Sequence, residues 1–202
     1  MSLVSLSTLK EYLPEITGTG ADTELTNIIK RAEADIARFL GFPVSDAGGS
    51  PSLEAATYTL YIDNPVFNNK FVLRLPIKPL ITITSIHSDP NRDYTASTEI
   101  TSGEYHLDLQ NAEVIIKIGV STVAFSNAFR SNRVVCSAGY SSAPEDLIHA
   151  VCVFASQLHR QKTSQGREST SQRGASTTYS PKVMPQEVKE ILNELRSTAT
   201  IL

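Results

Sequence analysis

One junction constrains the fold of this chain more than any other stretch: residues 133–160, where a short strand runs through a glycine into a helix. A run of β-branched residues predicts the strand, and Gly139 can adopt a positive φ at little cost. Ser142 and Glu145 fit the reciprocal N-terminal capping pattern, and Pro144 suits a first helical turn. The helix should therefore begin at this point.

The helix after the junction has almost no polar face. Its apolar residues are Leu147, Ile148, Ala150, Val151, Cys152, Val153, Phe154, Ala155 and Leu158. A helix that is apolar nearly all round is expected to be surrounded by other protein, and this one is too short to span a membrane. We therefore predict a buried central helix.

Two helices are predicted before it. The first is short: Leu9 and Leu13 lie on its apolar stripe, Ser5 or Ser7 can cap it, and Pro14 ends it.

The second helix is longer and has clear signals at both ends. We expect Asp22 to be its N-cap and Gly41 its left-handed C-terminal residue, with Phe42 folding back and Pro43 preventing continuation. Its apolar residues recur at helical spacing: Leu25, Ile28, Ile29, Ala32, Ile36, Phe39 and Leu40. This spacing predicts an amphipathic helix with one buried face.

Between residues 53 and 140 the hydrophobic period changes from helical to two, which is typical of β-strands. The residues expected on the buried faces are Tyr58, Leu60 and Ile62; Phe71, Leu73 and Leu75; Ile81 and Ile83; Tyr105, Leu107 and Leu109; and Val114, Ile116 and Ile118. Gln110 and Asn111 should turn the clearest hairpin. Polar residues on the alternate positions predict mainly antiparallel sheet with one face in water.

The last forty residues combine a polar stretch with a terminal helix. Residues 163–180 contain almost nothing apolar and cannot offset their ordering entropy alone. From 156 to 182 there are five basic residues against one acid, although the whole chain has a net charge of −3. After Pro185, one apolar stripe predicts an amphipathic helix. That stripe consists of Val188, Ile191, Leu192 and Leu195.

These observations predict an α+β fold. Residues 1–50 and 141–202 form a helical bundle of two N-terminal helices, the buried central helix and a C-terminal helix, with a flexible polar arm at 163–182. Residues 51–140 form an inserted, mainly antiparallel β module. A chain of 202 residues suits one domain with such an insertion, since about 70% of the unfolded surface can be buried at this size.

The sequence offers no catalytic, cofactor or metal site. Cys136 and Cys152 have no partner at ligand spacing and are predicted to be free thiols in a reducing compartment. His149 lies on the buried helix and in principle can reach either thiol. The alternative is a hydrogen-bonded core or rim histidine, because a thiol nucleophile also needs an electropositive setting.

The order of these elements resembles the head-tail connector (adaptor, or head-completion) proteins of tailed bacteriophages. The residues that carry the resemblance are Leu9, Lys10, Leu13, Asp22, Leu25 and Ile28 at the start; Gly139, Tyr140, Pro144, Asp146, Leu147 and Ala150 at the junction; and Pro185, Val188 and Leu192 at the end. Gly139, Tyr140, Pro144 and Asp146 are expected to form the structural junction of the fold.

The resemblance implies a non-enzymatic virion protein of the neck, between head and tail, assembled in the bacterial host cytoplasm. It implies docking on the portal protein after DNA packaging, a ring of about twelve copies, and a platform for a downstream stopper or tail-completion protein. No cofactor and no membrane are expected, and the arm can lie near DNA in the channel. The expected portal or subunit interface comprises Arg160, Arg167, Arg173, Val188, Ile191, Leu192 and Leu195.

Three other functions stay open at this stage. The first is another structural protein of the neck or tail. The second is a small ligand-binding or enzymatic α+β domain that uses the β module as a pocket, although no convergent polar residues can be assembled. The third is a nucleic-acid-binding module built on the basic arm, which the overall acidic balance does not favour.

Overall fold

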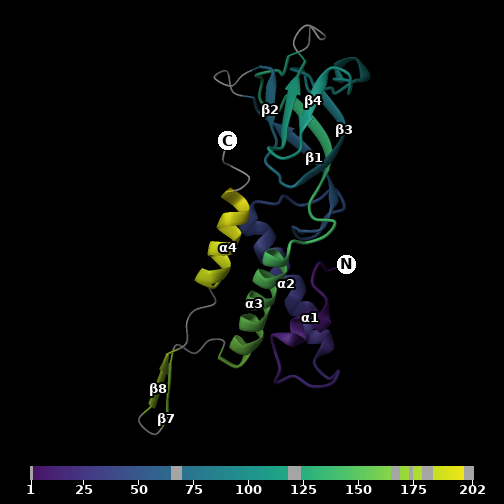
Figure 1. Ribbon diagram of the computed structural model, residues 1–202. Helices are drawn as coiled ribbons and strands as arrows, with labels where there is room; N and C mark the ends of the chain where they lie inside the picture. The colour runs from purple at the N-terminus through teal and green to yellow at the C-terminus, as the bar shows by residue number, and fades with distance from the viewer. Residues whose placement is uncertain are drawn as a thin grey trace. The chain divides into compact units, whose positions relative to one another are not determined.

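The computed structural model describes residues 2–64, 70–117, 124–164, 169–172, 175–178 and 184–197. By its internal contacts the chain divides into two compact units, one of Met1–Ile36 with Ser142–Thr198 and the other of Ala37–Ser141. The first unit is mainly helical and the second contains two antiparallel sheets (Figure 1). The predicted α+β fold is therefore confirmed.

The helical unit is built from α1 (Leu6–Glu11), most of α2 (Asp22–Leu40), α3 (Glu145–Arg160) and α4 (Gln186–Ser197). A short 3-10 helix, Gln161–Ser164, follows α3 directly. Two further strands, β7 (Ser169–Gln172) and β8 (Ala175–Thr178), pair antiparallel. This hairpin lies within the predicted polar arm and was not expected from the sequence. Arg167, Arg173 and Lys182 lie outside the described residues.

The ends of α1 and α2 follow local sequence signals. Ser5 caps α1, because its hydroxyl accepts a hydrogen bond from the Thr8 N–H at 3.1 Å. At the end of α2, Gly41 has a φ of +86°, and the N–H groups of Gly41 and Phe42 donate to the carbonyls of Arg38 and Ala37. This pair of hydrogen bonds is the Schellman motif, so the predicted C-terminal end of α2 is confirmed.

Two predicted N-terminal caps are wrong. Asp22 is the first helical residue of α2, not its N-cap, and its carboxylate pairs with Lys10 at 2.5 Å. For α3 the N-cap position is Pro144, and no side chain caps the helix. The Ser142 and Glu145 capping pattern is therefore not formed, because α3 begins two residues after the position that the pattern requires.

The interior of the helical unit is α3. No residue from Leu147 to His159 is exposed, as expected for a helix that is apolar nearly all round. The buried face of α2 packs in the same unit, and its residues Leu25, Ile29, Ala32 and Ile36 are at most 2% exposed. The central position of α3 in this bundle was predicted from composition alone.

The other unit contains two three-stranded antiparallel sheets. One has the order β1 (Ala56–Ile62), β6 (Asn132–Ala138), β3 (Leu80–Ser88). The other has the order β2 (Val72–Arg74), β5 (Glu113–Ile116), β4 (Tyr105–Asp108). A 3-10 turn, Ala96–Thr98, lies between β3 and β4 in the chain. Along β6 buried and half-buried residues alternate without interruption, which confirms the period-two prediction for the central strand.

The predicted alternation of buried and exposed side chains is not observed along β3 or at the end of β4. The pairing of β3 with β6 shifts register twice, between Leu80 and Thr82 and between Ile83 and Ser85. Bulges of this kind reverse the face that a side chain occupies, and Ile81, expected inside, is 40% exposed. Leu109 is 47% exposed because β4 ends one residue before it. Ile118 lies outside the described residues.

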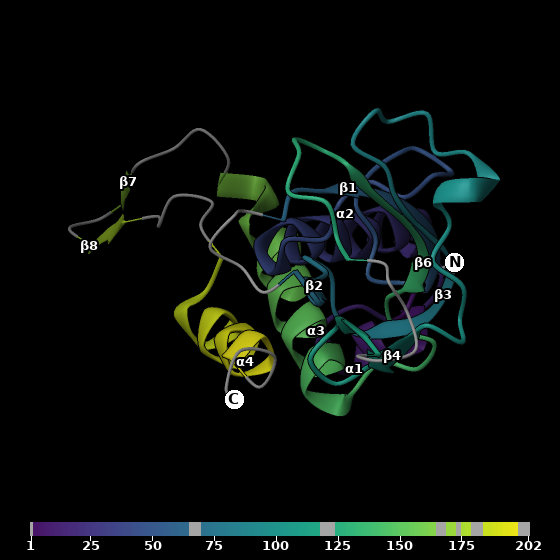
Figure 2. The same cartoon turned by 90° about the horizontal axis from the view of Figure 1, so that it is seen from above.

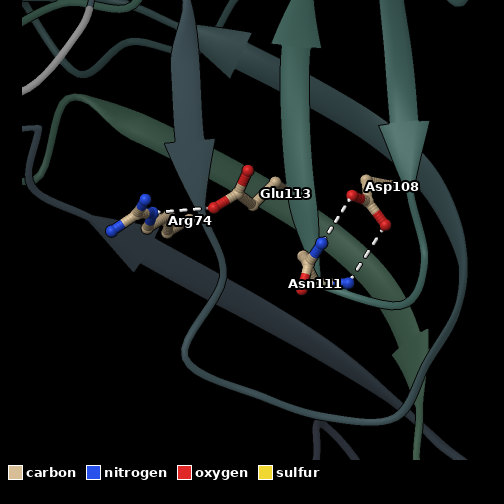
Figure 3. Close-up of polar contacts among 4 residues, drawn as sticks. All are labelled: Arg74, Asp108, Asn111 and Glu113. Carbon is tan, nitrogen blue, oxygen red and sulfur yellow. Dashed lines mark hydrogen bonds and ion pairs between the residues drawn. The ribbon is translucent and has the colours of Figure 1, made fainter. Parts of the chain in front are cut away.

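The β4–β5 hairpin confirms the predicted turn and shows what closes it (Figure 3). The Asp108 carboxylate accepts hydrogen bonds from the backbone N–H of Gln110 and Asn111, both at 3.0 Å, and from the Asn111 side-chain amide at 2.8 Å. Hydrogen bonding from Asn111 lowers the pKa of Asp108. On the neighbouring pair of strands, Arg74 of β2 donates to Glu113 of β5 at 2.7 Å.

Candidate interaction surfaces

The C-terminal helix α4 packs against α3, and Figures 1 and 2 both show the two helices side by side. Of the predicted interface stripe, Val188 and Leu192 are fully buried. Ile191 and Leu195 are half-buried at the margins of the same stripe. Half of the stripe is thus used inside the subunit, and its two outer residues keep accessible surface.

A polar contact crosses the apolar packing of the helical unit. The Tyr12 hydroxyl lies 2.9 Å from Nδ1 of His149 on α3, and the two rings are 5.7 Å apart. The other ring nitrogen, Nε2, lies 3.6 Å from the Glu187 carboxylate on α4. Burial raises the pKa of Tyr12, so the hydroxyl keeps its proton and can donate it to Nδ1. Tyr12, His149 and Glu187 therefore connect three segments of the unit.

Neither of the two cysteines has the setting of a nucleophile. Cys136 on β6 and Cys152 on α3 are both buried free thiols, and burial raises the pKa of each to about 11. A thiol that stays protonated is a poor nucleophile. His149 is engaged by Tyr12 and Glu187, which agrees with the alternative of a hydrogen-bonded core or rim histidine.

Arg160 ends α3 and is held on its own subunit. Its Nε donates to Glu15 at 3.3 Å and its terminal nitrogen donates to the Tyr12 carbonyl at 3.1 Å. The Arg160 side chain is still 56% exposed, so it can meet a partner without losing these contacts. The other two predicted basic residues, Arg167 and Arg173, lie outside the described residues.

Gly139, which the sequence places at the structural junction, lies where two backbone segments approach closely. Gly139 has a φ of +108°, and a Cβ there would lie 2.5 Å from the Glu54 carbonyl oxygen. The Tyr140 N–H donates to the Leu53 carbonyl, and the Ala55 N–H donates to the Tyr140 carbonyl. Only glycine fits this close approach of two backbones.

The last part of the junction, Pro144 and Asp146, forms the start of α3. The Pro144 carbonyl accepts from the N–H groups of Leu147 and Ile148, which starts the helical hydrogen bonding. Asp146 is exposed in the first turn, where a carboxylate interacts favourably with the helix dipole.

One hollow of the helical unit has a volume of about 830 Å³. Glu24 lies in its wall and pairs with Lys162 at 2.7 Å and with His159 at 3.6 Å, and the hydrogen bond from Lys162 lowers the pKa of Glu24. No group of three or more potential metal ligands is present among the described residues. Within the same residues no helix is long and apolar enough to cross a bilayer.

Together these features define an α+β protein in which the described polar groups hold helices and turns in place. A family model described as head completion protein matches residues 2–198. The chain belongs to the head completion protein family. It is a structural protein of the phage head-tail connection, as the order of its sequence motifs predicted.

Solved structures share the fold over most of the chain. A chain of the neck of an empty gene transfer agent particle, computed with C6 symmetry, is 16% identical with a TM-score of 0.56, covering 94% of this chain and 88% of that one. A chain of the native particle's virion is 18% identical with a TM-score of 0.51, covering 88% and 78%. A chain of the native neck, computed with C12 symmetry, is 14% identical with a TM-score of 0.50, covering 87% and 92%. No curated protein matches the chain.

Proposed function

We propose that this protein completes the packaged head by docking on the portal as a ring of about twelve copies, without enzymatic activity, and that the ring provides the platform for the next neck or tail protein. The family match over residues 2–198 carries the proposal. It is also supported by likeness to chains of particles whose necks were computed with C6 and C12 symmetry.

The accessible part of α4 is the surface that we assign to the portal or to a neighbouring subunit. Ile191 and Leu195 present apolar area beside the buried pair Val188 and Leu192, so a partner can extend the packing that α4 already makes with α3. Arg160, Arg167 and Arg173 supply positive charge in the segment that precedes α4, and such charge attracts an acidic partner at long range.

The first experiment is the native mass of the purified protein, with negative-stain electron microscopy of the same sample, alone and mixed with its portal. Closed rings in either sample are expected. If the protein stays monomeric and does not bind the portal, the proposal is refuted.

A second experiment tests α4 without removing it. Deleting residues 183–202 would expose the face of α3 that Val188 and Leu192 cover, so point variants are cleaner. The double variant Ile191→Asp with Leu195→Asp should lose portal attachment or ring formation, with far-ultraviolet circular dichroism reporting the fold. The matched control is Asn193→Asp, an exposed position on the same helix. Unchanged assembly of the folded double variant would remove α4 from the interface.

A third experiment tests the basic residues. Replacing Arg167 and Arg173 with Gln should weaken partner binding most at low ionic strength, because exposed charges are screened by salt. If binding is the same for both proteins across a salt series, these arginines serve solubility alone.

A further inference from the structure

The β-rich unit carries an exposed hollow in which arginines and aromatic rings alternate. The hollow has a volume of about 400 Å³ and is lined by Tyr61, Arg92, Tyr94, Phe129 and Arg130. We call these five residues the Tyr–Arg patch. Phe129 is 67% exposed and Tyr61 is 44% exposed. A phenylalanine with so much apolar area in water, beside a second exposed ring, is typical of a surface that meets another molecule.

The loops that carry the patch are held by one buried carboxylate. Asp89 is 4% exposed; its Oδ1 accepts from the Asn91 N–H at 2.8 Å, and its Oδ2 accepts from the N–H groups of Asp93 and Tyr94. Burial alone would raise the pKa of Asp89, but these hydrogen bonds lower it. The Asp89 N–H in turn donates to the Ser131 carbonyl at 2.8 Å. The two patch loops are therefore tied together by backbone contacts.

Three patch residues have unfavourable backbone conformations. Arg92, Tyr94 and Arg130 have φ values of +68°, +50° and +50°. Such conformations cost about 1–3 kcal/mol each and persist only where the surrounding structure enforces them. Here the Asp89 carboxylate accepts from the Tyr94 N–H, and the Asp89 carbonyl accepts from the Arg92 N–H. The Tyr94 hydroxyl, which donates to the Arg130 carbonyl, supports the third conformation. The patch is thus preorganised, which lowers the entropic cost of binding.

The guanidinium groups stack on the tyrosines. Arg130 lies over the Tyr61 ring at 5.2 Å, and Arg133 lies over the Tyr94 ring at 4.8 Å. The two tyrosine rings are 5.7 Å apart. Arg130 is exposed and keeps its guanidinium N–H edge for a further partner, whereas Nε of Arg133 is buried. Among the described residues no carboxylate forms an ion pair with the guanidinium group of Arg92, Arg130 or Arg133, although the Asp63 carboxylate accepts a hydrogen bond from the Arg130 backbone N–H.

The geometry favours a protein occupant over a nucleic acid. Bases bind such surfaces by stacking on open aromatic faces, but Arg130 and Arg133 already cover a face of each tyrosine. Tyrosine and arginine around a hydrophobic anchor are the composition of the central residues of protein interfaces. Phe129 is the anchor, and carboxylates are the groups that the free guanidinium edges would bind.

We propose that the Tyr–Arg patch binds a carboxylate-bearing surface of a second copy of this chain and forms one side of the contact between subunits. The inference rests on the proposed function, because a head-to-tail ring needs two different complementary surfaces on each subunit. The chain supplies the complementary charge: Glu145 and Asp146 are exposed neighbours in the first turn of α3, and neither forms an ion pair with another described residue.

Photocrosslinking identifies what contacts Phe129. The full-length chain is prepared with Phe129→p-benzoylphenylalanine, concentrated alone or mixed with its portal, and irradiated. A crosslinked dimer of the chain is expected, joined to a peptide that contains acidic residues, with the segment that includes Glu145 as the first candidate. Crosslinks to the portal alone, to added DNA, or to nothing in samples that contain rings would overturn the proposal.

Variants of the patch supply the second readout. Phe129→Ala with Arg130→Glu should weaken self-association by about tenfold or more in sedimentation experiments, because aromatic and arginine residues at the centre of an interface carry most of its binding energy. The control, Lys70→Glu, makes the same charge change on the same unit at an exposed side chain, and should associate like the unaltered chain. Equal association of all three proteins would refute the patch.

The two proposals fail in different ways. If the unaltered chain and the patch variant both form rings, the proposed function stands and the patch is wrong. If patch-dependent dimers form but rings never appear, with or without portal, the patch stands and the ring proposal is wrong.

Discussion

Replacing Gly139 with alanine tests how the junction is built. Gly139 has a φ of +108°, and an added Cβ would lie 2.5 Å from the Glu54 carbonyl oxygen, 2.8 Å from its carbon and 3.0 Å from the Ala55 nitrogen. All three are backbone atoms, so the clash can be relieved only by separating two chain segments. Those segments are joined by hydrogen bonds of 2.8 Å and 3.1 Å that involve Tyr140.

The stability that Gly139→Ala is expected to lose has two parts. Forcing an L-residue into the left-handed region costs about 1–2 kcal/mol. Weakening the two hydrogen bonds of Tyr140 adds about 1 kcal/mol each. Gly139→Ala should therefore lower the free energy of unfolding by about 3–4 kcal/mol, a large part of the stability of about 5–15 kcal/mol that is usual for a folded protein.

A second variant, Gly48→Ala, serves as a control that separates the backbone strain from the steric clash. Gly48 lies in the same unit with a φ of +78°, and a Cβ there would meet nothing within 4 Å. Gly48→Ala thus carries the backbone strain without the clash, and the smaller unfolded-state entropy of alanine affects both variants alike. Urea unfolding followed by circular dichroism should place Gly139→Ala about 2 kcal/mol below Gly48→Ala. If the two variants lose the same free energy of unfolding, the close approach of Gly139 to the Glu54 backbone has no effect on stability.

Three further predictions follow from the helical unit and the thiols. Leu192→Ala should lower the stability of α4 docking by about 2–5 kcal/mol, seen as faster hydrogen exchange in α4, whereas Asn193→Ala should change little. Tyr12→Phe and His149→Ala should show a coupling of about 1 kcal/mol in a double-mutant cycle, and additive losses would remove the hydrogen bond. Cys136 and Cys152 should resist iodoacetamide until denaturant is added. Because burial raises both pKa values from 9.0 to about 11, their stabilising contribution is complete below pH 9.0 and is lost as the pH rises toward 11.

The features that could be predicted from the sequence are local or periodic. Gly41 and Phe42 specify the end of α2 within one turn, and the alternation along β6 follows from residue type alone. The α3 helix could be placed in the interior because nearly all of its positions are apolar. Each of these depends on neighbours in the chain, which a sequence displays directly.

The features that were missed depend on contacts between distant segments. Asp89 reaches Ser131, and Tyr94 reaches Arg130, across 36 residues or more. Periodicity assigns faces but not neighbours, so it could not bring these loops together. The bulges that expose Ile81 arise from pairing with β6 and have no local signal. The aromatic and basic residues beside the Asp89 turn and before β6 were the available clue to the patch.

The interface proposed on α4 and the Tyr–Arg patch can be related by mixing variants. If they are the two sides of one subunit contact, the Ile191→Asp, Leu195→Asp protein retains the patch side and the Phe129→Ala, Arg130→Glu protein retains the α4 side. Alone, neither can associate. Together they retain one complete contact, and since every further addition needs a lost surface, growth stops at a heterodimer.

A different result assigns α4 to the portal instead. In that case the α4 variant still forms rings, because its subunit contacts are intact, but those rings no longer bind the portal. The patch variant then fails to form rings with or without the α4 variant. Native mass spectrometry of the two proteins, separately and mixed, distinguishes the arrangements, because only a shared contact converts two monomeric variants into a heterodimer.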